Sequence, residues 1–255
     1  MKEFFGFGGY ARTPEGYFSW QHITYVTSII LLAIFLAVFL GRRNRNRPAQ
    51  EKNRVLVVAA ILIDTFEIFK ITVFSLRGHS AEAILYNLPL FLCSIQLITL
   101  PLAAFAKGRV KEAALDFVSI FGVLGMVLGT YGAGQNYNAY PVLSIDNVVS
   151  GITHSISGFA AIYILVSGMA SMKKSNIVIS YTILLAFCVT AYVVNRLIDY
   201  NYMFLMRDDG TPYVLVYQLV KGDPILYPLA VVVLFLIYIT LFYAVFYLLS
   251  KKKKA

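Results

Sequence analysis

The sequence contains a succession of mostly apolar runs, each about 18 residues or longer. A helix rises about 1.5 Å per residue, so a run of this length crosses the ~30 Å hydrocarbon layer of a bilayer. Inside that layer the backbone must satisfy its own hydrogen bonds, which favours helices. We therefore predict an all-α, polytopic membrane protein, a single domain over residues 1–255, with seven transmembrane helices at approximately 20–40, 55–76, 84–106, 114–131, 147–172, 177–198 and 224–250.

Composition agrees with this prediction. Hydrophobic residues make up 59% of the chain and charged residues only 14%, as is typical of membrane proteins. The longest gap between predicted helices, 199–223, is too short for a soluble domain. This gap is rich in tyrosine and contains the turn sequence DDGTP, so we expect an interfacial element that serves either as a lid or as a membrane anchor.

Basic residues gather in alternate connecting segments. Of the 22 Lys and Arg residues, 15 lie in four places: RRNRNRPAQEKNR after the first predicted helix, residues 107–113, Lys173–Lys174 and the terminal Lys251–Lys254. Positive charge favours the cytoplasmic side, so we predict that the N-terminus is outside and the C-terminus cytoplasmic. The net charge of +9 then reflects topology and contact with membrane lipids, not nucleic-acid binding.

Polar residues recur inside the predicted helices, where they are costly and therefore indicate function or pairing. Glu67 and Lys70 are three residues apart and can pair along helix 55–76; the pair either shapes a cavity or relays protons. Counting about 1.5 Å per residue, the polar residues of four helices fall at a similar depth. We predict one polar cavity in the outer half of the bilayer, lined by His22, Glu67, Lys70, Asn87, Gln96, Asn147, Asn195 and Arg196.

The stretch LPLFLCSIQL, residues 88–97, places Pro89, Cys93 and Gln96 on one face of a predicted helix. Proline cannot donate a backbone hydrogen bond, so we expect a kink there. Cys93 is either a nucleophile or a small packing residue. His154 is either the base that activates this thiol or a histidine bonded between helices. Cys188, the other cysteine, also lies within a predicted helix, which makes a disulfide framework improbable.

A family resemblance rests on four patches: LPLFLCSI, the entry SWQHI, the charged residues of helix 55–76 and the segment DYNYMFLM after residue 198. Together they resemble the YwaF family of bacterial integral membrane proteins, which is similar to eukaryotic membrane acyltransferases that remodel phospholipids. The resemblance implies Cys93 as nucleophile, His154 as its partner and the bacterial plasma membrane as location. The family pattern has LPLHLC, whereas this chain has Phe91 at the histidine position; His22 is the available substitute.

Three functions follow from these residues. In the first, the protein transfers acyl groups or otherwise modifies lipids, with a phospholipid or acyl donor as substrate and with Lys70, Asn195 or Arg196 holding a lipid phosphate. In the second, it transports or binds a small polar or anionic solute through Glu67, Lys70 and Arg196. In the third, it is a structural membrane protein. The sequence leaves the oligomeric state open.

Other site types find little support in the sequence. The last predicted helix has no lysine before residue 251 that could form a retinal Schiff base. The three histidines lack the spacing of a metal site, so we expect neither a metal nor a cofactor. Gly122, Gly125 and Gly129 lie in helix 114–131, and we expect them to allow close helix packing.

Overall fold

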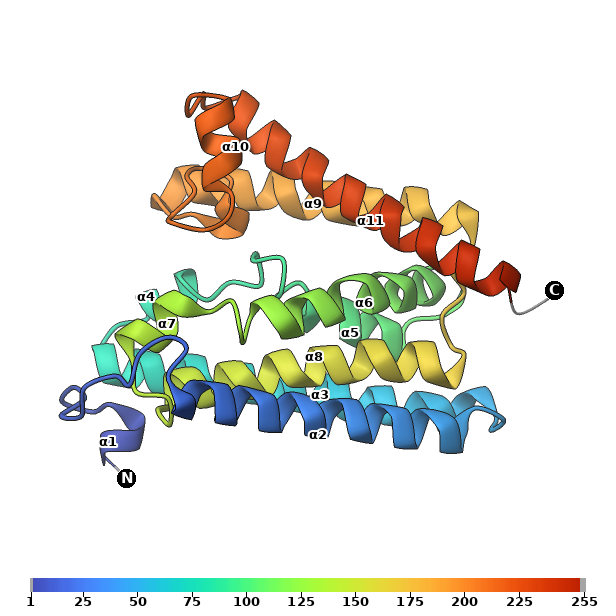
Figure 1. Ribbon diagram of the computed structural model, residues 1–255, viewed down its shortest axis with the longest axis horizontal. Coiled ribbons are helices and arrows are strands. Elements are labelled where there is room, and N and C mark those ends of the chain that lie inside the picture. Colours follow the sequence, from blue (N-terminus) through green and yellow to red (C-terminus); the bar gives the residue numbers. More distant parts are fainter. Residues whose placement is uncertain (1, 253–255) are drawn as a thin grey trace. The chain divides into compact units, whose positions relative to one another are not determined.

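The computed structural model describes residues 2–252, and the side chains of residues 3–248. Within this part the chain forms helices and irregular segments and no β-strand, so the prediction of an all-α protein is confirmed. Figure 1 shows the elements, which in chain order are α1 (Lys2–Phe5), α2 (Trp20–Asn44), α3 (Ala49–Gly78), α4 (Glu82–Leu85), α5 (Gln96–Phe105), α6 (Gly108–Leu128), α7 (Gly134–Ala139), α8 (Ile145–Ser167), α9 (Lys174–Ile198), η1 (Tyr202–Phe204), α10 (Val214–Leu219) and α11 (Leu226–Lys252).

Four of the described helices, α2, α8, α9 and α11, are long and apolar enough to cross a bilayer. Helices α3 and α6 have 30 and 21 residues, but each carries several ionisable side chains, which in α6 lie in the first half. Helix α5 has ten residues, and ten residues rise only about 15 Å. The structure thus agrees with a polytopic membrane protein, while the count of seven spans stays a prediction.

The predicted helix 84–106 is wrong as a continuous element, since α4 and α5 are separated by irregular backbone over residues 86–95. Pro89 has no N–H to donate and its ring obstructs a preceding carbonyl. Ser94 stabilises the alternative conformation, because its hydroxyl accepts from Phe91 N at 3.0 Å and donates to Phe91 O at 3.1 Å. Such local side-chain bonds compete with a helix, so the expected kink is a full interruption. The other six predicted helices correspond to α2, α3, α6, α8, α9 and α11.

The described chain groups into two compact units. The first runs to Asn87 and resumes over Gln96–Ser171. The second comprises the interruption Leu88–Ile95 together with the chain from Met172 onward. The chain therefore changes unit at both ends of the irregular segment, and each unit is described by itself below. The side chains of Lys251–Lys254, expected at the cytoplasmic face, lie outside the described residues.

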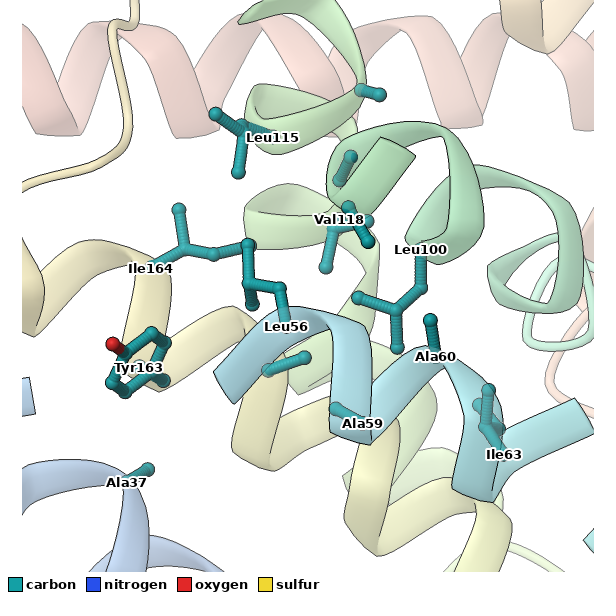
Figure 2. Close-up of a cluster of buried hydrophobic side chains, with 14 residues drawn as sticks. Ala37, Leu56, Ala59, Ala60, Ile63, Leu100, Leu115, Val118, Tyr163 and Ile164 are labelled. Atoms are coloured by element: carbon teal, nitrogen blue, oxygen red, sulfur yellow. The ribbon is translucent and has the colours of Figure 1, made fainter. Parts of the chain in front are cut away.

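Helix α8 is the centre of the first unit, where it packs against α2, α3 and α6. Figure 2 shows the apolar core cluster: Leu56, Ala59, Ala60 and Ile63 of α3 face Leu100 of α5, Leu115 and Val118 of α6, and Tyr163 and Ile164 of α8. All are buried. Small residues let the helices approach closely, which is how helices associate in membranes.

Gly122 of α6 and Gly129, the residue that follows α6, provide that approach, as predicted for helix 114–131. A Cβ built at Gly122 would lie 2.6 Å from Ser157 O of α8. One built on Gly129 would overlap the imidazole of His154, also on α8. Neither position therefore accepts a side chain without moving α8 or its side chains.

Hydrogen bonds at one end of the first unit show in which direction its helices run. Asn53 Nδ2 of α3 donates to Ala104 O of α5 at 2.7 Å, and Lys111 Nζ of α6 donates to the same carbonyl at 3.2 Å. Lys52 Nζ donates to Ser167 O of α8 at 3.0 Å. The start of α3 and of α6 thus lies beside the last turn of α5 and of α8. Both α5 and α8 are therefore antiparallel to α3 and α6.

The second unit is built on the hairpin of α9 and α11. Ser180 Oγ and Tyr243 Oη are 3.3 Å apart, and Tyr181 Oη and Thr240 Oγ1 are 2.5 Å apart. Between these helices, the predicted turn at DDGTP is present, because Thr211 N donates to Asp208 O at 2.9 Å. The helix α10 follows that turn.

Candidate functional site

The thiol of Cys93 lies on the irregular segment of the second unit, in a half-buried position. The segment is held at its start by Leu88 N, which donates to Tyr202 Oη at 3.1 Å, and at its end by Ile95 N, which donates to Phe91 O at 3.0 Å. The other cysteine differs: Cys188 is 3% exposed within α9, and its thiol lies 3.6 Å from the sulfur of Met203. The two cysteines thus occupy different environments.

Phe91, at the position where the resemblance expects a histidine, is part of an aromatic group in the second unit. Its ring centroid lies 4.9 Å from that of Tyr202, 6.0 Å from Phe204 and 6.1 Å from Tyr200. Edge-on contacts of this kind are favourable for aromatic rings. A ring at position 91 therefore packs the Cys93 segment onto the segment that follows α9.

Asn195 and Arg196, the other predicted site residues of the second unit, lie at the end of α9. The Asn195 amide holds Tyr202 from both sides, donating to Tyr202 O at 3.0 Å and accepting from Tyr202 N at 2.7 Å. Arg196 is exposed, and its guanidinium donates to Tyr192 Oη at 3.1 Å. Asn195 thereby supports the Cys93 segment through Tyr202.

His154 of α8, in the first unit, is half-buried and its Nδ1 lies 2.7 Å from Ser150 O. A carbonyl oxygen only accepts, so Nδ1 carries the proton and Nε2 carries the lone pair. The ring packs on Gly129, the residue that follows α6, where a side chain would overlap it. The orientation and the tautomer of this imidazole are thus set within the first unit, and they suit a base that acts through Nε2.

The other histidine predicted at the site, His22, is fully buried near the start of α2. Its Nδ1 accepts from Phe18 N at 3.1 Å, and its Nε2 lies 3.4 Å from Thr130 O. The ring centroid lies 3.9 Å from that of Tyr137. These contacts bind α2 to the end of α6 and to α7, so they favour a packing role for His22.

Glu67 and Lys70 form the ion pair that their spacing predicts. Lys70 Nζ and Glu67 Oε1 are 2.7 Å apart, and the two side chains are only 15% and 11% exposed. Glu67 lies on the buried stripe of α3 together with Ile63. Because both side chains are poorly solvated, loss of either partner would leave an uncompensated buried charge.

The three remaining predicted residues belong to the first unit. Asn87 Nδ2 donates to Ala83 O at 2.8 Å and closes the turn after α4. Asn147 Nδ2 donates to Tyr140 O and Pro141 O, both at 3.0 Å, which ties the start of α8 to the preceding segment. Gln96 is fully buried at the start of α5, and its Oε1 accepts from Thr99 Oγ1 at 3.2 Å.

The predicted single cavity draws residues from both units. Cys93, Asn195 and Arg196 belong to the second unit, and the others to the first. Their convergence therefore stays a prediction. Among the described side chains, no three His, Cys, Asp or Glu residues gather as a metal ion would require.

One buried cluster was absent from the sequence analysis. Arg77 at the end of α3 forms a bidentate pair with Asp146 of α8, with distances of 2.9 and 2.8 Å, and Tyr10 donates to the same carboxylate. Burial, and then this hydrogen bond, raise the pKa of Tyr10 above its usual range. The only signal in the sequence was a basic residue at the end of one helix and an acidic residue at the start of another. Helices in many proteins share this pattern, so it does not identify a pair.

Comparison with curated proteins and with solved structures finds no match to the chain. A family model, described as the TMEM164 family, matches residues 17–250. That range includes the four helices that are long and apolar enough to cross a bilayer, both cysteines and every predicted site residue. Because the match extends over most of its length, the chain belongs to the TMEM164 family, a family of transmembrane proteins.

Proposed function

We propose that the protein is a membrane enzyme that transfers acyl groups between lipids, with Cys93 as nucleophile and His154 as general base. The observation that carries this proposal is the position of Cys93: a half-buried thiol on an irregular segment that interrupts an apolar helix. A thiol placed only for packing needs no such interruption, and Cys188 has none. Catalytic residues are disproportionately found on loops that a rigid scaffold positions.

The chemistry needs a group that removes the thiol proton. His154 is suited to this role because its Nδ1–H is engaged with Ser150 O, which leaves the lone pair on Nε2. In the proposed reaction the Cys93 sulfur bonds to the ester carbonyl carbon, the ester C–O bond breaks, and the released alcohol takes the proton held by the imidazole. The hydroxyl oxygen of a second lipid then bonds to the thioester carbonyl carbon and gives its proton to the imidazole, and the C–S bond breaks as the imidazole returns that proton to the sulfur.

Substrate binding follows from the same assignment. The acyl chain enters sideways between helices, and Lys70, Asn195 or Arg196 hold the lipid phosphate. LPLFLCSI and SWQHI resemble the YwaF family. That family is similar to phospholipid-remodelling acyltransferases, and this similarity supports the substrate class. Seven spans, an outside N-terminus, a cytoplasmic C-terminus and the bacterial plasma membrane complete the proposal.

The test is labelling of membranes by a lipid-like thiol-reactive probe. Labelling should disappear in Cys93→Ser and fall steeply in His154→Ala. Cys188→Ser is the matched control, because that thiol is buried against Met203, and it should label like the wild type. Equal labelling in Cys93→Ser and wild type would contradict the assignment of the nucleophile.

A second candidate, a carrier for a small polar or anionic solute, is favoured by the buried Glu67–Lys70 pair on α3. Cells that lack the protein discriminate the two functions. The enzyme predicts a changed acyl-chain profile of the phospholipids, whereas the carrier predicts an unchanged profile with reduced uptake of a solute.

A further inference from the structure

The hydroxyl of Tyr202 replaces a backbone acceptor at the start of the Cys93 segment, residues 88–95. In a continuous helix the N–H of Leu88 would donate to the carbonyl four residues earlier, that of Ile84. Here Asn87 N donates to Ile84 O at 3.1 Å, and Leu88 N donates to Tyr202 Oη at 3.1 Å. Tyr202 is 0% exposed, so bulk water does not compete for this bond. One side chain, 114 positions away in the sequence, therefore fastens the start of the segment.

Local bonds fix Cys93 to the rest of its segment. Ser94 Oγ accepts from Phe91 N at 3.0 Å and donates to Phe91 O at 3.1 Å, and Ile95 N donates to the same carbonyl at 3.0 Å. Cys93 lies inside the turn that these bonds close. The Phe91 ring lies edge-on to the Tyr202 ring, with the centroids 4.9 Å apart. The position of Cys93 is thus tied to Tyr202 twice, through the backbone of Leu88 and through the ring of Phe91.

Tyr202 is itself held against the end of α9. Both ends of the Asn195 amide bond to its backbone, Nδ2 to Tyr202 O at 3.0 Å and Oδ1 to Tyr202 N at 2.7 Å. The preceding residue, Asn201, closes the loop after α9, because its Nδ2 donates to Arg207 O at 2.8 Å and its Oδ1 accepts from Met206 N at 2.9 Å. Tyr202 therefore has little freedom to move relative to α9.

The backbone directly after Tyr202 is strained. Met203 and Phe204 both have a φ of 55°, in the left-handed region that residues other than glycine seldom adopt. Met203 is 1% exposed, and its sulfur lies 3.6 Å from the Cys188 thiol. Strained residues persist only where the surrounding contacts determine their conformation, and they gather at functional sites. The strain thus favours a loop whose exact geometry matters over one that only connects α9 to α10.

We propose that Tyr202 is a positioning residue for Cys93, a role that rests on the proposed function. Its hydroxyl and its ring hold the thiol in a fixed place relative to α9, and Asn195 holds Tyr202. Tyr202 acts through Leu88 and Phe91 and takes no part in making or breaking bonds. Such support is needed because Cys93 lies outside the regular hydrogen bonding of a helix, and a displacement of about 1 Å can slow a positioned reaction about a hundredfold.

The test compares two reactions of the Cys93 thiol in the full-length protein, with Cys93→Ser as the blank. A long-chain acyl p-nitrophenyl ester acylates the sulfur only when its carbonyl carbon is oriented toward it. Iodoacetamide is small and alkylates the thiolate from many directions. Alkylation is measured across pH, and its rate is compared on the high-pH plateau, where the thiol is fully ionised.

Tyr202→Phe removes the hydroxyl that binds Leu88 and keeps the ring that contacts Phe91. Ser94→Ala is the second variant, since it breaks the bonds to Phe91 at the thiol end and leaves Tyr202 intact. Tyr227→Phe is the matched control. It removes the same atom from a tyrosine of the same unit, and that hydroxyl is buried without a hydrogen-bond partner among the described residues.

We expect acylation in Tyr202→Phe to slow about a hundredfold, with the alkylation plateau and its pH profile unchanged. Ser94→Ala should show the same selective loss, and Tyr227→Phe should match the wild type in both reactions. Unchanged acylation in Tyr202→Phe, or a parallel fall in both reactions, would overturn the positioning role and leave the proposed function standing. If Tyr202→Phe does not fold, normal acylation in Ser94→Ala would overturn it equally. Alkylation of wild-type Cys93 without any acylation would overturn the proposed function and this role with it.

Discussion

Single residues decide how the proposed base is held. His154 lies on α8, but its position depends on a glycine just after α6, because the imidazole occupies the space where Gly129 would have a side chain. The bond from Nδ1 to Ser150 O then fixes the tautomer. The sequence predicts close packing at Gly129 and makes His154 a candidate base, yet neither spacing nor composition shows that the two residues touch.

Gly129→Ala tests this contact. The added methyl group overlaps the imidazole, so we expect a loss of about 1–3 kcal/mol of stability from overpacking together with loss of the His154-dependent labelling of Cys93. Gly78→Ala is the matched control, since no atom lies within 4 Å of the added Cβ; it should leave the thermal midpoint and the labelling unchanged. Normal labelling in Gly129→Ala would argue against a role for the ring orientation.

At the scale of elements, the sequence predicts that the helix is disturbed between α4 and α5, but it leaves open how long the interruption is. Pro89 indicates where the break falls, because proline removes a backbone hydrogen bond and obstructs a preceding carbonyl, but proline alone does not decide it, since α5 continues through Pro101. The length of the irregular segment depends on Ser94 bonding to Phe91 and on Tyr202, more than 100 residues later, accepting from Leu88. Contacts between such distant positions leave no periodic trace in the sequence, so a kink was expected where the chain has ten irregular residues.

The Arg77–Asp146 pair joins α3, α8 and the N-terminal segment 2–19, which holds Tyr10. We expect Arg77→Met to cost about 3 kcal/mol in detergent-solubilised protein, because Asp146 is only 5% exposed and would lose its partner. Segment 2–19 should also become sensitive to protease. Arg47→Met is the control: the Arg47–Glu51 pair is 58% and 44% exposed, so its loss should change stability by less than about 1 kcal/mol. Matching thermal shifts in the two variants would refute the buried character of the pair.

Asp223 caps the start of α11, since its Oδ1 accepts from Leu226 N at 2.8 Å and from Ile225 N at 2.9 Å. These backbone donors hold the pKa of Asp223 below its usual range. The stabilisation is therefore present above the ordinary carboxyl pKa of about 3.9 and is lost as the pH falls through the depressed value. Asp223→Ala should abolish it at every pH.

Hydrogen exchange measures this cap. In Asp223→Ala the amides of Ile225 and Leu226, which donate to the carboxylate, should exchange faster at neutral pH, and wild type should approach that behaviour only in acid, after correction for intrinsic rates. Amides in the middle of α9 serve as the internal control. Equal protection in mutant and wild type at neutral pH would rule out a contribution from the carboxylate.

At the scale of the whole molecule, the long apolar runs were the part of the fold that could be predicted. They gave α2, α8, α9 and α11, because a run of this length has no stable alternative in hydrocarbon. Helices α3 and α6 were also found, although their ionisable residues obscure the signal. The division into two units was not predicted, since it depends on which helices pack together. For the site, the Glu67–Lys70 pair was predictable from spacing; the unsatisfied amide of Gln96 was visible only once burial was known.

The number of spans can be decided from the two faces of the membrane. Seven spans with an outside N-terminus place Thr13 and Leu219 outside and Ser175 in the cytoplasm. If only the four apolar helices crossed, Ser175 would follow the second crossing and lie outside, and Leu219 would follow the third and lie inside.

Single cysteines at these exposed positions, introduced into a variant lacking Cys93 and Cys188, can be treated in intact cells with a membrane-impermeant maleimide. Labelling at 13 and 219 but not at 175 is the expected result. Labelling at 175 would exclude seven spans, because an odd number of crossings between Thr13 and Ser175 is what keeps that residue inside.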